Sequence, residues 1–344
     1  MDTYTMDIFL FSLVNMYLEP TSTHIIPVHP SSTEGWKTQK LSADKHEFPG
    51  KNSNRKVAYL WSHSNGFHKE SFHPLMRRFK DHLRSLREYD QTDITFISWD
   101  ARNHGDSARL NENDLYDSYR WSDNAMDTKQ IIDEFQLSTG YDQFIGIGHS
   151  FGATSMILCE YYYPGTFNGL CVIEPVLSSV MYDGEIKEQF PILASRKRRD
   201  EWSSFEDCHK SLASRGFFKL LHPEVLDLYV KYGMYKTEKG TVKLKCPREQ
   251  EYLVFKFSQY DTFVAMRSLQ NLNIPIHFVY ALDSTFVAPE DAVSVTDINR
   301  ERITLDFVPG THMVPNETPD IIVPHIMKLT DRVNKEGSNT KAKL

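Results

Sequence analysis

The stretch Ile145–Ala153, which reads IGIGHSFGA, decides the fold of this chain. Apolar residues lead into its Gly-His-Ser-Phe-Gly turn, and a helix-forming run over 154–163 follows. A strand, a sharp turn and a helix in this order form the context that a G-x-S-x-G nucleophile elbow requires. We expect Ser150 in a strained backbone conformation, with Gly148 and Gly152 allowing strand and helix to approach closely. Ser150 is therefore predicted to lie above the edge of a sheet, beside a helix N-terminus that favours developing negative charge.

Strand-like and helix-like stretches alternate on both sides of this turn. Besides the strand that leads into the turn, the expected core strands cover residues 56–61, 94–99, 169–173, 274–281 and 302–308, and a last helix covers 319–333. Strands separated by helical runs of 12 to 20 residues are typical of βαβ units. The pattern predicts an α/β fold with a mostly parallel central sheet flanked by helices.

The alternation stops between the strands 169–173 and 274–281. Residues 176–271 show mostly helical periodicity, notably over 202–217 and 224–236. We interpret this segment as a helical cap over the C-terminal edge of the sheet, where open α/β sheets bind ligands. The expected organisation is an N-terminal extension with the first strands at 1–54, a core at 55–175 and 272–333, the cap insertion at 176–271, and a flexible tail at 334–344.

A histidine near the end of the chain is placed to serve the elbow serine. A serine hydroxyl is a poor nucleophile at neutral pH and needs a base within hydrogen-bond reach. The segment 307–315, FVPGTHMVP, puts His312 in a glycine loop between the last strand and the last helix. The chain order of serine, acid and histidine that accompanies this kind of elbow ends in such a loop. His312 is therefore the predicted base.

Two carboxylates are candidates for the acid that orients this histidine. Glu174 ends the strand 169–173, and Asp283 follows the strand 274–281. Either could orient the imidazole and stabilise the imidazolium that forms during the reaction. Glu174 is the preferred candidate, and Asp283 stays open as the alternative.

The oxyanion hole of such a site is built from two backbone N–H groups. One belongs to Phe151, directly after the nucleophile, and the other is expected in the turn after the first core strand, at Asn65. His63 and Gly66 in the same turn, and His104 in the turn DARNHGDS, are interpreted as structural residues near the site.

Composition restricts the class of function. The 344-residue chain is 40% apolar and 25% charged, and its net charge of −7 argues against nucleic-acid binding. No spacing typical of a metal site, no G-x-G-x-x-G and no Walker loop occurs, so neither a metal nor a cofactor is predicted. The apolar run 8–18 is too short for a membrane span and lacks the flanks of a signal peptide, so we expect a packed or frayed helix.

The chain ends in Ala342-Lys343-Leu344, which is close to the S-K-L peroxisomal signal. Small, basic and leucine residues stand at its three positions, with Lys341 just before them. The tripeptide predicts capture by the peroxisomal import receptor and a peroxisomal location.

These motifs resemble the α/β-hydrolase superfamily from about His24 to Val333. More narrowly, the chain resembles a fungal group of peroxisomal α/β-hydrolases that includes proteins of host-selective toxin biosynthesis (AK- and AF-toxin type) and, more distantly, a yeast peroxisomal lipase. The motifs that carry the resemblance are His24–Pro27, His63–Phe67 with Lys69 and Glu70, Asn103–Ser107, Trp121 with Asp123, Gly146–Ser150, Ile173–Val176, and Pro309-Gly310 with His312.

The resemblance implies a triad serine and histidine at Ser150 and His312, and a role in peroxisomal acyl chemistry of a toxin moiety. The chain departs from the superfamily at Ser284, where the acid usually stands. A cap rich in Phe, Leu, Tyr and Met predicts a small lipophilic acyl substrate, as an ester or a CoA thioester. Two other functions stay open: an acyltransferase that uses the same elbow, and a catalytically degenerate binding protein.

Overall fold

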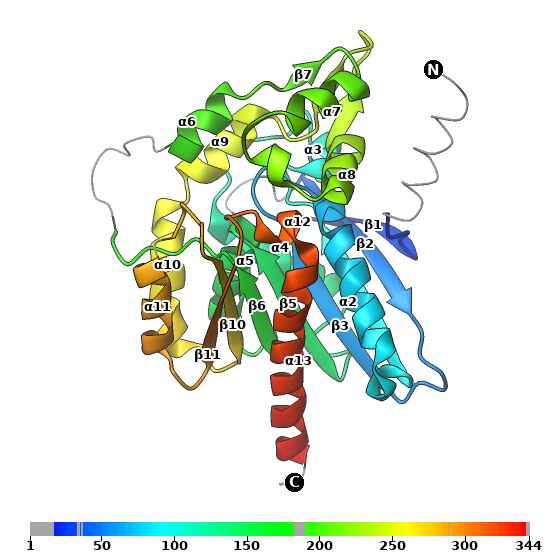
Figure 1. Cartoon of the computed structure of the whole chain (residues 1–344), viewed down its shortest axis with the longest axis vertical. Coiled ribbons are helices and arrows are strands. Elements are labelled where there is room, and N and C mark those ends of the chain that lie inside the picture. The colour runs from blue at the N-terminus through cyan, green and yellow to red at the C-terminus, as the bar shows by residue number, and fades with distance from the viewer. Residues whose placement is uncertain (1–16, 33–34, 36, 182–189, 288, 342–344) are drawn as a thin grey trace.

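The computed structural model describes residues 17–32, 35, 37–181, 190–287 and 289–341 (Figure 1). Most of the N-terminal apolar run and the C-terminal tripeptide Ala342-Lys343-Leu344 lie outside the described residues. Among those described, no helix is both long enough and apolar enough to cross a bilayer.

An eight-stranded sheet with the order β1-β2-β4-β3-β5-β6-β10-β11 forms the centre of the fold. Its strands are β1 (Ser22–Pro27), β2 (Lys40–Phe48), β3 (Arg55–Ser62), β4 (Thr92–Trp99), β5 (Gln143–His149), β6 (Gly169–Ile173), β10 (Ile276–Ala281) and β11 (Ile303–Val308). From β4 to β11 all neighbours are parallel, whereas β1 pairs with β2, and β2 with β4, antiparallel. The mostly parallel sheet expected from the alternating pattern is confirmed.

Strand β2 was not predicted, because its nine residues, KLSADKHEF, are rich in polar side chains. The structure buries several of these side chains and gives them partners. The Thr23 hydroxyl donates to Asp44 Oδ1 over 2.7 Å, and His46 Nδ1 lies 3.2 Å from the Glu19 carbonyl. A half-buried strand is usually recognised by alternating apolar and polar residues. In β2 some of the buried positions are polar side chains with hydrogen-bond partners, so the sequence does not show this alternation.

Helices cover both faces of the sheet (Figure 1). On one face lie α2 (His73–Ser85) and α13 (Pro319–Lys341), whose apolar side chains pack against Tyr59, Trp61 and Ile147. The other face is covered by α4 (Trp121–Glu134), α5 (Phe151–Tyr162), α10 (Gln259–Ser268) and α11 (Pro289–Ile298). Two separate hydrophobic cores thus hold the strands rigidly between two layers of helices.

A further layer lies above the C-terminal ends of the strands (Figure 1). It contains α6 (Phe190–Lys197), β7 (Glu201–Trp202), α7 (Phe205–Ala213), α8 (Pro223–Gly233), β8 (Met234–Lys236), β9 (Val242–Leu244) and α9 (Arg248–Lys256). We call this layer the cap. Helix α10, although inside the segment 176–271, packs against α5 beside the sheet instead.

The cap is less helical than the periodicity suggested. Strands β7, β9 and β8 form a small antiparallel sheet within it. The helices expected over 202–217 and 224–236 are correspondingly shorter. Gly240, with φ of +84°, allows a tight turn between Thr237 and Thr241, and this turn joins β8 and β9 in a hairpin. Strand β8 thus occupies the last three residues of the helix predicted over 224–236.

Helix α13 continues through Asn334, where a flexible tail was expected, to Lys341. Arg55 donates a hydrogen bond to Asn334 Oδ1. Glu336 accepts from Arg302 at 3.1 Å and from Arg332 at 3.0 Å. The tail boundary inferred from polar composition is therefore wrong, because polar side chains here bond to the body of the protein.

Candidate active site

The GHSFG stretch forms a tight turn between β5 and α5. Ser150 lies at φ 53° and ψ −118°, in the strained region that non-glycine residues seldom adopt, and its N–H donates to the Ile173 carbonyl over 2.9 Å. A Cβ on Gly148 would lie 2.5 Å from the backbone of α5, and one on Gly152 would lie 2.4 Å from the Ser62 carbonyl oxygen. Both glycines are therefore required by close backbone approach.

Three side chains from distant parts of the chain form one hydrogen-bonded row. His312 Nε2 lies 2.9 Å from Ser150 Oγ, and His312 Nδ1 lies 2.8 Å from Glu174 Oε2. The exposed fractions of Ser150, His312 and Glu174 are 5%, 7% and 0%. With the Nδ1 proton donated to Glu174, Nε2 is left to accept the proton of the serine hydroxyl. This geometry can activate the serine as a nucleophile.

Of the two candidate acids, the structure places Glu174 beside the histidine. Glu174 has a φ of 51°, and its Oε1 accepts the Ala281 N–H over 2.6 Å. The Asp283 side chain is exposed, and its backbone N–H donates to the Gly310 carbonyl. A shift of the loop that would bring Asp283 to His312 is therefore not observed.

Ser284, at the position where the resemblance places the acid, contacts Glu174. Its hydroxyl donates to Glu174 Oε2 over 2.5 Å, the oxygen that also faces His312. We expect Ser284→Ala to lower kcat about tenfold with little change in KM, because a hydrogen bond to a charged group contributes about 1.5–3 kcal/mol. Steady-state kinetics on an activated ester would measure this effect. Ser284→Thr, which keeps the hydroxyl, should restore kcat, and equal losses in both variants would contradict a positioning role.

Two contacts of His312 were not predicted from the sequence. His149 Nε2 lies 2.8 Å from the His312 carbonyl, and burial together with the nearby His312 lowers the pKa of His149 to about 3. His149 is therefore neutral, and its Nε2–H can donate to that carbonyl. Phe286 stacks on the imidazole of His312, with ring centroids 3.9 Å apart and an interplanar angle of 20°. The first contact could have been suspected within the GHSFG motif, whereas the second joins two loops and has no local signal.

The turn after β3 lies against the N-terminus of α5. A Cβ on Gly152 would come within 2.6 Å of the His63 carbonyl oxygen, so this turn and the elbow are in close contact. Phe151 begins α5, where backbone N–H groups have no partner within the helix. The Gly66 N–H is occupied by His104 Nε2 at 2.9 Å. Asn65 and Phe151 remain the two candidate donors to an oxyanion.

His63 and His104 act as hydrogen-bonding parts of the two turns. The Ala101 N–H donates to His63 Nε2 over 3.1 Å, and His63 Nδ1 lies 2.8 Å from the Ser64 carbonyl. Burial lowers the pKa of His63 to about 4 and that of His104 well below its usual value. Both rings are therefore neutral and fix the backbone of the turns.

The cap holds the turn after β3 from above. Tyr229 on α8 donates to the Gly66 carbonyl over 3.0 Å, and Asn65 Nδ2 donates to the Glu251 carbonyl over 2.9 Å. Arg198 donates to the Tyr229 hydroxyl over 2.9 Å and forms an ion pair with the Glu251 carboxylate. We call Arg198, Tyr229 and Glu251 the cap clamp. These contacts fix the expected oxyanion turn to the cap.

A buried lysine, Lys69, follows the same turn by a few residues in the chain. Lys69, which is 2% exposed, lies 2.6 Å from Glu70, 2.7 Å from Asp106, 3.4 Å from Asp100 and 3.5 Å from Asp44. Burial disfavours the charge of Lys69, but the four carboxylates outweigh it and raise the pKa of the ammonium well above its usual value. The lysine is therefore charged and neutralises an otherwise strongly acidic cluster.

We expect Lys69→Met to lower the free energy of unfolding by about 3–5 kcal/mol, since removing one partner leaves buried charges uncompensated. Urea denaturation would measure the loss. Lys80→Met removes an ammonium from a pair with the exposed Asp81 carboxylate and should cost at most about 1 kcal/mol. Equal stability losses in the two variants would contradict the role assigned to Lys69.

Comparison with known proteins identifies the family of this chain. The model of the Alpha/beta hydrolase family matches residues 60–324. The chain is 25% identical over 247 residues to the peroxisomal membrane protein LPX1 of Saccharomyces cerevisiae, covering 66% of this chain and 63% of that protein. It is 26% identical over 189 residues to the type I acyl-CoA thioesterase mpaH of Penicillium brevicompactum, covering 51% of this chain and 39% of the thioesterase.

Solved structures show the same fold. The peroxisomal α/β-hydrolase Lpx1 of Saccharomyces cerevisiae aligns with a TM-score of 0.74 at 20% identity, covering 92% of this chain and 87% of that chain. E-2-(acetamidomethylene)succinate hydrolase aligns with a TM-score of 0.65 at 16% identity, covering 85% and 95%. With a family match over most of its length, a mostly parallel eight-stranded sheet and a GHSFG turn, this chain belongs to the Alpha/beta hydrolase family.

Proposed function

We propose that the chain is a serine hydrolase that cleaves an ester or thioester of a lipophilic carboxylic acid. The observation that carries the proposal is the buried hydrogen-bonded row from Glu174 through His312 to Ser150. Each role follows from chemistry: the serine attacks, the histidine moves the proton, and the glutamate holds the histidine in one tautomer and stabilises its charge.

The reaction would proceed in two acyl-transfer steps. His312 Nε2 takes the proton of Ser150 Oγ as this oxygen attacks the carbonyl carbon, and the N–H groups of Asn65 and Phe151 donate hydrogen bonds to the carbonyl oxygen as it becomes negatively charged. His312 then protonates the departing alcohol or thiol. Water activated by the same imidazole releases the acid and restores the serine. Positive charge on His312 is stabilised at each step by Glu174.

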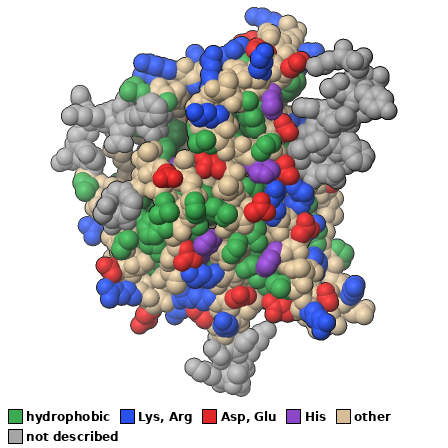
Figure 2. All heavy atoms as spheres, in the orientation of Figure 1, with side chains coloured by type: hydrophobic (Ala, Val, Ile, Leu, Met, Phe, Trp, Pro, Cys, Tyr) green, Lys and Arg blue, Asp and Glu red, His purple; other side chains and the backbone are tan. Residues whose placement is uncertain are grey.

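Apolar side chains around the site support a lipophilic acyl group. Phe286 covers His312 on one side, and Phe67, beside the expected oxyanion turn, packs against Phe217 and Tyr229. Met313, next to His312, joins the hydrophobic cluster of the cap. Hydrophobic side chains also gather on the face of the molecule below the α6–α9 layer (Figure 2). An acyl chain entering between cap and sheet would therefore meet apolar surface.

A thioester is the preferred form of the substrate. The mpaH relatives are type I acyl-CoA thioesterases, and the LPX1 relative is a peroxisomal membrane protein. We therefore place the reaction in peroxisomes, on acyl-CoA compounds. The part in fungal toxin biosynthesis that the sequence resemblance implies stays a prediction.

Octanoyl-CoA and p-nitrophenyl octanoate, each offered with and without an added alcohol or amine, would test the proposal. Release of CoA and free octanoic acid by the wild type, with little transfer to the acceptor, is the expected result. Predominant transfer of the octanoyl group to the acceptor would identify an acyltransferase instead. No turnover, together with no labelling of Ser150 by a fluorophosphonate, would identify a binding protein and overturn the proposed reaction.

A further inference from the structure

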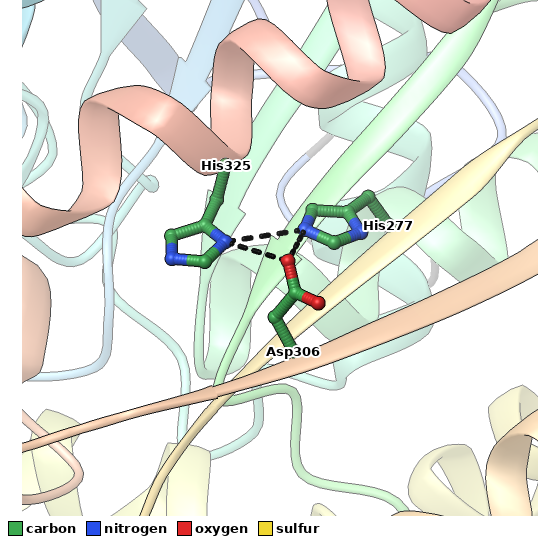
Figure 3. Close-up of side chains that lie close together, drawn as sticks. All are labelled: His277, Asp306 and His325. Carbon is green, nitrogen blue, oxygen red and sulfur yellow. Dashed lines mark hydrogen bonds and ion pairs between the residues drawn. The ribbon is translucent and has the colours of Figure 1, made fainter.

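Far from the elbow serine along the sheet, three side chains from separate elements converge at the edge of the fold. His277 comes from β10, Asp306 from β11 and His325 from α13, and their polar atoms point toward one another (Figure 3). His277 Nε2 lies 3.4 Å from Asp306 Oδ2 and 3.5 Å from His325 Nδ1, and the latter two atoms are 2.9 Å apart. Among the described residues, this is the one group of at least three His, Cys, Asp or Glu side chains with the spacing of metal ligands.

We propose that His277, Asp306 and His325 bind a divalent transition-metal cation, with Zn²⁺ as the best-fitting ion. Zinc binds imidazole nitrogen and carboxylate oxygen at about 2.0–2.2 Å in a tetrahedral arrangement, which places neighbouring ligand atoms roughly 3.4 Å apart. The two separations that involve His277, 3.4 and 3.5 Å, match this value, whereas Asp306 Oδ2 and His325 Nδ1, at 2.9 Å, would have to move apart by about 0.5 Å. Two imidazoles and one carboxylate also favour zinc, nickel, copper or cobalt over magnesium or calcium, which prefer oxygen ligands.

His277 is prepared as a ligand by its surroundings. It is fully buried, so its ring is held in one position by its neighbours. Its Nδ1 lies 2.8 Å from Thr304 Oγ1. A proton on Nδ1 donated to this hydroxyl leaves the lone pair of Nε2 directed at the other two side chains. Such a partner behind a histidine ligand fixes its tautomer and ring orientation.

Two cationic side chains oppose a metal at this position. Lys328 Nζ lies 2.7 Å from both oxygens of Asp306, and the charge of Arg332 also acts on His277. The Lys328 side chain is half exposed, so its ammonium can turn toward solvent or keep only Asp306 Oδ1. The side chains of Asp306 and His325 are 29% and 18% exposed. Water can therefore reach the site and complete the coordination of a metal with three protein ligands.

A cation bound here would tie three elements together. Strands β10 and β11 are neighbours at the edge of the sheet, and α13 crosses them on the face that it shares with α2. Asp306 lies six residues before His312 on the same segment. Metal binding would thus stabilise the packing of β10, β11 and α13, between which the loop of His312 lies in the chain. This inference does not depend on the proposed hydrolase reaction, because the site is built from residues that take no part in it.

Titration of the EDTA-treated, full-length protein with Co²⁺ and Zn²⁺ tests the site. We expect Co²⁺ to give the visible absorption of a four-coordinate nitrogen and oxygen site, and Zn²⁺ to raise Tm. Asp306→Asn and His325→Ala should weaken binding, measured by calorimetry, at least about tenfold, and Thr304→Val up to about tenfold. His209→Ala, which alters a His–Asp pair between α7 and α8, is the matched control and should leave the affinity unchanged.

Lys328→Gln gives a test that misfolding cannot imitate, because it should tighten Zn²⁺ binding by removing a competing cation from Asp306. The proposal is overturned if the wild type shows neither the Co²⁺ spectrum nor a Tm increase. It is equally overturned if Asp306→Asn and His325→Ala bind Zn²⁺ as well as the wild type does. Either result would mean that the three side chains form only a hydrogen-bonded network between α13 and the sheet. An affinity that Lys328→Gln leaves unchanged would also count against the site.

Discussion

Ser150→Ala is expected to lower kcat/KM for p-nitrophenyl octanoate at least about 10³-fold, since a triad without its nucleophile keeps only the contribution of binding and of the oxyanion hole. The side chain is small and nearly buried, and its Oγ bonds to His312. The fold should therefore survive the substitution, and the loss should appear in kcat. Initial rates and the intact mass after fluorophosphonate treatment would measure both activity and adduct.

The matched control is Ser155→Ala, in the helix α5 that follows Ser150. The Ser155 hydroxyl is buried and has no hydrogen-bond partner in the described part of the chain, so its removal should alter neither rate nor labelling. The adduct should map to Ser150 in the wild type and in Ser155→Ala, and should be absent from Ser150→Ala. Full esterase activity in Ser150→Ala would contradict the proposed mechanism.

Glu174→Gln should produce the second large effect, a loss in kcat of about 10³- to 10⁴-fold. An amide keeps the shape of the side chain but cannot stabilise the imidazolium, and its NH₂ group favours the wrong tautomer of His312. The Ala281 N–H and the Ser284 hydroxyl both donate to the present carboxylate, which indicates that the site is built for a charged acceptor. Burst kinetics and fluorophosphonate labelling rates would report the same loss.

Asp283→Asn serves as its counterpart, because Asp283 is exposed and does not lie beside the histidine. It should keep kcat within about twofold of the wild type, in line with the small effects of most surface substitutions. The reverse pattern, with activity lost in Asp283→Asn and kept in Glu174→Gln, would show that the loop after β10 rearranges during catalysis and would refute the assignment of Glu174.

The sequence predicted those parts of the fold whose signals are local. Around Ser150, the apolar strand, the glycines and the helix-forming run are all visible within one short stretch of sequence. The loop of His312 is visible in the same way, as a strand, a glycine turn and a helix in succession. Apolar strands such as β3 and β6 were also placed to within one residue at each end. In these stretches, hydrophobic pattern, turn chemistry and tertiary environment agree, which is the condition under which sequence-based reasoning succeeds.

Features that depend on partners from elsewhere in the chain were missed or left open. Strand β2 is stabilised by polar contacts that no window of its own sequence contains. The choice between Glu174 and Asp283 required the distance across two neighbouring strands. Phe286 over His312 depends on how one loop is folded. The His277, Asp306 and His325 group joins residues 29 and 19 apart in the chain, a spacing that no metal motif would suggest.

The cap clamp makes the geometry of the expected oxyanion turn depend on the cap. Tyr229 donates to the Gly66 carbonyl, and the Glu251 carbonyl accepts from the Asn65 side chain. Under the proposed reaction, one oxyanion donor is thus positioned by residues that follow it by 163 and 186 positions in the chain. Substitutions in the cap clamp are therefore expected to change kcat as well as KM, although none of its residues belongs to the hydrogen-bonded row of Ser150.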